Sequence, residues 1–229
     1  MPGLQTIADL IGATNSIKFV SGILAVDKYS AADVSTTYAS LESSAPGRFI
    51  VGLGGAHGPK PLATLNAYLD EVDVPLERRV LAALGPRMLD LARERSAGAF
   101  PFLITSAYSA EARKVLGPDK LLSVSHLVVL ETDADRARAI ARDTIGFFPQ
   151  IPGYVASLER QGFNAKDQAE LPDQMVDALA AWGTPADIKA KLSEHLDAGA
   201  DHVAVNVITG VTGPQPIEQW KALAPTLLA

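Results

Sequence analysis

The chain contains no cysteine, and this absence excludes several kinds of chemistry at once. Without thiols there are no disulfides, no thiolate nucleophiles and no cysteine ligands for zinc or iron–sulfur clusters. Any redox chemistry must therefore depend on an organic cofactor. The four histidines show no H-x-x-x-H or H-E-x-x-H spacing, so the sequence predicts no metal site.

Long apolar runs and long basic runs are also absent. No apolar run reaches the roughly 18 residues that a membrane-spanning helix needs, and the opening MPGLQTIADL has no signal-peptide features. We therefore expect a cytoplasmic protein without a membrane partner. The formal net charge is −6 and the longest basic run is Arg78-Arg79, which argues against nucleic-acid binding. The expected ligand is a small organic molecule.

The chain does have a regular alternation of β-branched runs and amphipathic stretches. Of its 229 residues, 48% are hydrophobic and 20% are charged, which favours one folded domain over disorder. The alternation is typical of βα units and a parallel sheet. This pattern alone fits both a (β/α)₈ barrel and an open doubly wound sheet. The six predicted strands lie at residues 17–25, 48–53, 79–84, 99–105, 123–131 and 202–208.

A single domain spanning residues 1–229 is expected, with an insertion at its rim over residues 149–183. Pro149 and Pro152 interrupt the helix that follows the fifth predicted strand. The segment QGFNAKDQAELP, residues 161–172, is polar and is predicted to be a loop.

Four segments, taken in chain order, carry a resemblance to a known family. They are LQTIADLIGATNSIKFVSGIL, PGRFIVGLGGAHG, RVLAALGPRMLDLARERSAGAFPFLIT and WGTPADIKAKLSEHLDAGADHVAVNVI. Their order and spacing resemble the luciferase-like monooxygenase superfamily, especially its branch that uses the 8-hydroxy-5-deazaflavin coenzyme F-420. Each motif is weak by itself, but together they span essentially the whole chain.

The resemblance implies an α/β fold, a TIM-type (β/α)₈ barrel that is incomplete because its first two strands are missing. It also implies an oxidoreductase that moves a hydride to or from a small organic substrate, with coenzyme F-420 as cofactor and FMN as the second choice. The sequence does not identify the substrate.

Members of the family begin with a strand, a helix and a second strand that ends in an E-H or D-H pair, and this chain starts after that point. An alternative is therefore a truncated relative that binds a flavin, a deazaflavin or an apolar ligand without turnover. Missing strands would leave sheet edges exposed, so a homodimer is expected.

The resemblance also points to residues that would contact the coenzyme ring. Gly22 and Ile23 occupy the position where F-420-dependent relatives carry a cis non-proline peptide against the ring. Gly54, Gly55 and His57 follow the second predicted strand, at the carboxyl face where barrel active sites lie. His57 is in addition a candidate acid or base, and no other catalytic residue is proposed.

A second group of residues would hold the coenzyme tail. Gly85, Pro86 and Arg87 begin a helix directly after a strand, which presents free N–H groups to a phosphate, and Arg87 could add a charge-assisted bond. Thr105 could bond the ring or the tail, although it equally fits a helix N-cap. His126 is expected to be a core residue, whereas His195 is expected to be solvated.

Overall fold

The computed structural model describes residues 3–211 and 215–229, and the ladders that join its strands are parallel. The strands are β1 (Phe19–Val20), β2 (Leu24–Ala25), β3 (Phe49–Gly54), β4 (Arg79–Leu81), β5 (Gly98–Ala99), β6 (Leu121–Val129), β7 (Ala180–Trp182) and β8 (His202–Val207). Each of the six predicted strand regions overlaps at least one of these strands, although the region 99–105 shares only Ala99 with β5, and β7 was not predicted. Helices alternate with them, as the sequence predicted.

The helices are α1 (Leu4–Gly12), α2 (Ala31–Ser44), α3 (Pro61–Glu71), α4 (Pro86–Arg95), α5 (Ser106–Leu116), α6 (Ala134–Ile145), α7 (Pro152–Arg160), α8 (Ala165–Glu170), α9 (Asp173–Leu179), α10 (Pro185–Asp197) and α11 (Ile217–Leu227). Two short 3₁₀ helices are η1 (Leu76–Arg78) and η2 (Phe148–Gln150). Within the described ranges, no helix is both long enough and apolar enough to cross a membrane.

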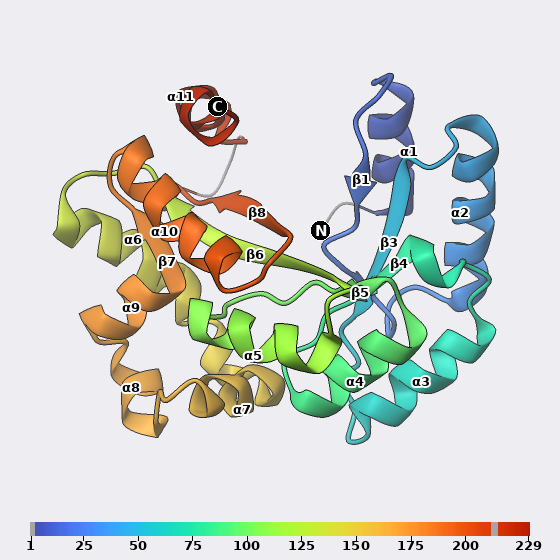
Figure 1. The fold of residues 1–229 in the computed structure, drawn as a ribbon, viewed down its shortest axis with the longest axis horizontal. Coiled ribbons are helices and arrows are strands. Elements are labelled where there is room, and N and C mark those ends of the chain that lie inside the picture. Colours follow the sequence, from blue (N-terminus) through green and yellow to red (C-terminus); the bar gives the residue numbers. More distant parts are fainter. Residues whose placement is uncertain (1–2, 212–214) are drawn as a thin grey trace. The chain divides into compact units, whose positions relative to one another are not determined.

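Internal contacts divide the chain into two compact units. The first contains the residues up to Phe100 together with Val115–Leu121, and the second contains Pro101–Lys114 and the residues from Leu122 onward. Each unit has its own parallel ladders (Figure 1).

In the first unit, β3 is the central strand. It pairs with β1 and β2 along one side and with β4 along the other, and β4 pairs in turn with β5 (Figure 1).

The predicted strand over residues 17–25 consists of two short strands, β1 and β2, with a cis peptide bond between Gly22 and Ile23. Beside this break, the Ser21 hydroxyl donates to Gly52 O at 3.1 Å and accepts from Gly52 N at 2.8 Å. A Cβ on Gly52 would stand 1.9 Å from Ser21 O, so only glycine fits there.

In the second unit, β6 pairs with both β7 and β8. Leu127 and Val129 pack in a core with helices α6, α7 and α9, while Val128 packs in another core with α10 and α11. The two sets alternate along β6, as side chains of one strand must. Both faces of β6 are therefore covered by helices.

The predicted loop over residues 161–172 is wrong, because this segment contains α8. Asn164 caps α8: its side chain accepts from the N–H groups of Lys166 and Asp167, and the Asp167 carboxylate accepts from Asn164 N. This reciprocal capping starts a helix within a polar stretch. The predicted insertion at residues 149–183 is accordingly helical over most of its length, with α7, α8 and α9 followed by β7.

Candidate functional site

The first unit brings several predicted site residues to one edge of its ladder. Ala25 is in register with Gly54, and Leu53 is in register with Leu81, so β2, β3 and β4 end side by side. The loops that follow parallel strands emerge at their carboxyl ends, where α/β proteins bind ligands. We call this region the carboxyl edge of the first unit.

The predicted cis peptide between Gly22 and Ile23 is confirmed and lies at this edge. Gly22 is exposed, and a Cβ on it would stand 3.2 Å from the ring of Phe100, which directly follows β5. Gly22, Ile23 and Phe100 thus form a partly exposed apolar surface. Sequence reasoning did not single out Phe100, because the predicted strand over residues 99–105 placed it inside a strand, whereas β5 ends at Ala99.

Gly54 is buried, and the lack of a side chain at this position allows Ala82 and Ile23 to pack against its backbone. A Cβ on Gly54 would stand 2.7 Å from the Ala82 Cβ and 3.1 Å from Ile23 Cδ1. The space beside Gly54 is therefore filled by the chain itself. Gly55 has a φ of +71°, a left-handed conformation that favours glycine, and it turns the chain at the end of β3.

His57 lies in the loop after β3 and meets Asp27, which follows β2. Its Nδ1 is 2.7 Å from Asp27 Oδ2, and the two side chains are 57% and 39% exposed. The hydrogen bond from His57 is the main cause that holds the pKa of Asp27 below its usual value. Sequence reasoning missed Asp27, because nothing in the spacing of residues 27 and 57 shows that their loops meet.

Gly85, Pro86 and Arg87 are placed as predicted, at the start of α4. Pro86 is the first helical residue, no side chain caps this end, and the first turn holds no acidic residue. Arg87 is exposed and forms no ion pair with the part of the chain that the structure describes. This helix start can accept an anion, because its N–H groups and dipole favour negative charge.

Thr105 belongs to the second unit, where it caps α5. Its hydroxyl oxygen accepts from Tyr108 N at 3.3 Å, so the N-cap interpretation is confirmed. Its own N–H donates to Oε1 of Gln161 at 2.7 Å. The backbone of Thr105 is therefore already bonded, and only its hydroxyl group is left for a ligand.

The prediction that His195 is solvated is wrong. His195 is 1% exposed, because it lies on the same face of α10 as Ile188 and Leu192, and this face is buried. Its Nδ1 bonds the Ser109 hydroxyl at 2.8 Å, and its Nε2 bonds Nδ1 of His126 at 3.1 Å. His126 is 1% exposed, which confirms it as a core residue, but its Nε2 has no partner among the described residues.

Burial keeps both of these histidines neutral. Desolvation, followed by the charge of His195, lowers the pKa of His126 to about 3, and desolvation lowers the pKa of His195 to about 4. Both side chains are therefore uncharged near neutral pH.

No group of three or more His, Asp or Glu side chains in the described ranges could hold a metal ion.

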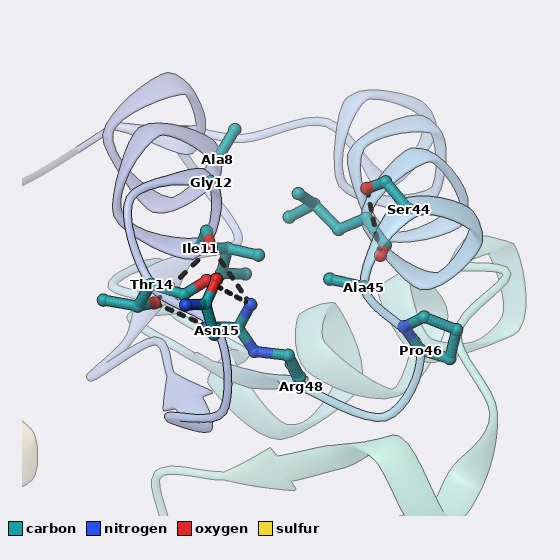
Figure 2. Close-up of a pocket in the computed structure, with 10 residues that line it drawn as sticks. Ala8, Ile11, Gly12, Thr14, Asn15, Ser44, Ala45, Pro46 and Arg48 are labelled. Atoms are coloured by element: carbon teal, nitrogen blue, oxygen red, sulfur yellow. Dashed lines mark hydrogen bonds between the residues drawn. The ribbon is translucent and has the colours of Figure 1, made fainter.

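A cavity of about 520 Å³ lies between α1 and α2, and none of the predicted site residues line it (Figure 2). Arg48, which directly precedes β3, reaches into this region and donates to the carbonyl groups of Ile11, Thr14 and Ile17. The cavity is thus at the amino end of β3, away from the carboxyl ends where barrel sites form. We assign no reaction to it.

Comparison with known proteins gives one related sequence and several related structures. No family model matches the chain. The chain is 26% identical over 265 residues to a 5,10-methylenetetrahydromethanopterin reductase of Methanolobus tindarius, covering 87% of this chain and 80% of that protein.

Among solved structures, the chain is similar to an F-420-dependent secondary alcohol dehydrogenase, with a TM-score of 0.70, 13% identity, and coverage of 99% of this chain and 84% of the other. It is also similar to the coenzyme F-420-dependent tetrahydromethanopterin reductase of Methanopyrus kandleri, with a TM-score of 0.70, 16% identity, and coverage of 98% and 86%.

These structural likenesses confirm the predicted fold class, a TIM-barrel-like α/β fold that is incomplete in this chain. The related sequence and the motifs described above agree with them. The related sequence and the fold therefore agree with the resemblance of the four motifs to the luciferase-like monooxygenase superfamily and its F-420-dependent branch.

Proposed function

We propose that the protein is an oxidoreductase that uses coenzyme F-420 to move a hydride to or from a small organic substrate. The observation that carries this proposal is the partly exposed apolar surface that Gly22, Ile23 and Phe100 form at the carboxyl edge of the first unit. Two similar structures are F-420-dependent by their descriptions, which favours this coenzyme over FMN.

The residues at this edge fit a flat, largely apolar ring system. Gly22, Ile23 and Phe100 provide a partly exposed surface on which a ring can lie. Gly54 contributes indirectly, because its missing side chain lets β3 approach Ile23. Gly55 turns the following loop, which brings His57 to the same edge.

The start of α4 is suited to the charged tail of the coenzyme. Arg87 is exposed there, and the first turn lacks any acidic side chain that would repel a phosphate. Thr105, the other residue predicted to hold the tail, belongs to the second unit, where its N–H is donated to Gln161, and its role stays a prediction.

When bound, the coenzyme supplies the hydride acceptor or donor, and the protein's own residues bind the ring, orient it and exclude water. The second candidate function, ligand binding without turnover, uses the same surface. The two functions differ only in whether a bound substrate is oxidised or reduced.

Titration calorimetry with coenzyme F-420 and with FMN tests the proposal. We expect F-420 to bind more tightly, and Arg87→Ala to weaken its binding by about 1–3 kcal/mol through loss of a charged hydrogen bond. Arg93→Ala is the matched control, since Arg93 lies late in the same helix and pairs with Asp90. Equal binding by the Arg87 and Arg93 variants would remove Arg87 from the site, and tighter FMN binding would overturn the choice of coenzyme.

We also propose that the protein is a homodimer. β8 pairs with β6 along one side, and the described residues place no strand along its other side. An open edge of this kind is usually covered, because its unpaired backbone groups invite further pairing. Light scattering at micromolar concentration should give twice the mass of one chain; a single-chain mass would contradict this proposal.

A further inference from the structure

Helix α11 carries a row of apolar side chains that are open to water. Ile217 is 51% exposed and Trp220 is 44% exposed. Together with the half-buried Ala224 they recur at intervals of three and four residues, so all three lie on one face of the helix. Leu228, which directly follows the helix, is 85% exposed and continues this row. We call these four residues the α11 face.

Another side of α11 attaches the helix to the second unit. Leu223 is 2% exposed and lies in one core with Leu192 of α10 and Val207 of β8. Leu227 and Val203 of β8 pack against the same core. The α11 face is therefore not needed to hold the helix in place, and an exposed tryptophan among apolar neighbours is typical of a protein–protein contact.

The strand that α11 packs against has an edge without the usual protection against further pairing. β8 pairs with β6 along one side, and no strand within residues 3–211 and 215–229 pairs along the other. Exposed edge strands generally carry charged residues or proline, which hinder pairing with another chain. The sequence of β8, HVAVNV, contains no Asp, Glu, Lys, Arg or proline. The edge of β8 is thus suited to being covered.

The charges on this part of the second unit balance one another. α11 has one acidic and one basic side chain, Glu218 and Lys221, which are exposed and pair at 2.9 Å. A strongly acidic or strongly basic partner would therefore meet no net opposite charge here. A surface with the same balanced pair is complementary when it is turned by half a rotation, which is what a second copy of the chain provides.

We propose that the α11 face and the open edge of β8 form the contact between two copies of this chain, related by a two-fold axis. This inference rests on the homodimer proposed above and names the surface through which it forms. The two α11 helices run antiparallel, with Ile217 opposite Ala224 of the partner subunit. Glu218 then lies within one helical turn of Lys221 of the partner subunit, and the reverse pair forms by symmetry.

The size of the helix explains why the strand edge belongs to the same contact. An α-helix of 11 residues is about 16 Å long, and with a width of about 10 Å it offers far less than the roughly 800 Å² that each partner buries in a stable dimer. The contact must therefore extend past α11. The edge of β8, which shares a core with α11, is the continuation that the second unit offers.

Sedimentation velocity of the whole chain at micromolar concentration tests this surface. The unchanged protein should have the mass of two chains, and Trp220→Glu should weaken the dimer by about 30-fold or more, because it places a charge among the apolar residues of the contact. Phe147→Glu is the matched control, since Phe147 is 60% exposed in the same unit but lies outside the α11 face. If the two variants dissociate equally, or neither does, the α11 face is not the contact.

Charge exchange tests the two-fold arrangement with substitutions that leave the apolar residues in place. Glu218→Lys gives each copy two positive charges on this turn of α11, and Lys221→Glu gives each copy two negative charges. Each variant alone should associate about tenfold more weakly than the unchanged protein, whereas an equimolar mixture of the two should regain the lost affinity. A mixture that associates no better than its separate components overturns the antiparallel contact.

The outcomes also separate this contact from the proposals made above. A single-chain mass for the unchanged protein overturns both the homodimer and this contact. A two-chain mass that persists in Trp220→Glu leaves the homodimer in place and overturns the α11 contact alone. The measured quantity is mass, so neither outcome depends on whether coenzyme F-420 binds or a substrate is turned over.

Discussion

Two histidine networks, one in each compact unit, place the same side chain in opposite settings. In the first unit, His57 meets the ionised carboxylate of Asp27 at an exposed edge. In the second, His126 and His195 are buried with the Ser109 hydroxyl and bond no carboxylate. The comparison teaches that burial, more than the residue type, sets the pKa of a histidine side chain, as the lowered pKa values of His126 and His195 show.

The buried network is also incomplete as a set of hydrogen bonds. One proton must lie between His195 and His126, and another between His195 and Ser109. Whichever way these bonds run, Nε2 of His126 has no partner among residues 3–211 and 215–229. A buried group without a partner costs about 1–3 kcal/mol, so this network tolerates little further loss.

The largest expected effect is the loss of stability on breaking the buried network. His195→Ala leaves both Ser109 and Nδ1 of His126 without this partner and opens a small cavity, so the free energy of unfolding should fall by about 2–4 kcal/mol. Urea unfolding at pH 7.5 measures this change. The control, His57→Ala, should stay within about 0.5 kcal/mol, because its side chain is exposed. If the free energy of unfolding fell by similar amounts in the His195 and His57 variants, the two networks would not differ in their contribution to stability.

An effect of similar size is expected from pH. An unfolded histidine has a pKa near 6.5, whereas His126 and His195 have pKa values of about 3 and about 4 when folded. Below pH 6.5 the unfolded chain therefore binds more protons than the folded one, and the free energy of unfolding falls as pH falls toward 4. The slope is about 1.4 kcal/mol per pH unit for each histidine, and it vanishes above pH 6.5.

Urea unfolding at pH 7, 6 and 5 checks this dependence. The control is the triple variant Ser109→Ala, His126→Leu and His195→Leu, which removes both partners of every hydrogen bond in the network. In this variant, the slope of the free energy of unfolding against pH should lose the part that the two histidines cause. Equal slopes in the triple variant and the unchanged protein would show that the buried histidines do not govern acid stability.

Sequence patterns predicted the fold well, because the longer strands, β3, β6 and β8, lie in segments that contain β-branched residues. The strand that was missed, β7, is the segment Ala180-Ala181-Trp182, which like β2 and β5 has no β-branched residue and is held by pairing with β6. Its strand character comes from tertiary contact, which a local pattern does not contain.

The candidate site was predicted less completely. The cis peptide at Gly22 came from the family resemblance and is confirmed, but Asp27 and Phe100 were missed because their roles depend on which loops and strand ends meet. His195 was misjudged because its neighbour Glu194 suggested an exposed face, whereas the periodicity set by Ile188 and Leu192 buries it. Contacts between distant segments, rather than composition, decided each of these cases.

The side chain of Gln161 links two helices of the second unit. It follows α7, and its amide group bonds Thr105 N, Leu103 O and the Ser157 hydroxyl. The carboxyl end of α7 and the start of α5 are thus linked through one side chain. Any displacement of α7 that moves Gln161 would also break its bond to Thr105 N, so the positions of α7 and α5 depend on each other through this amide group.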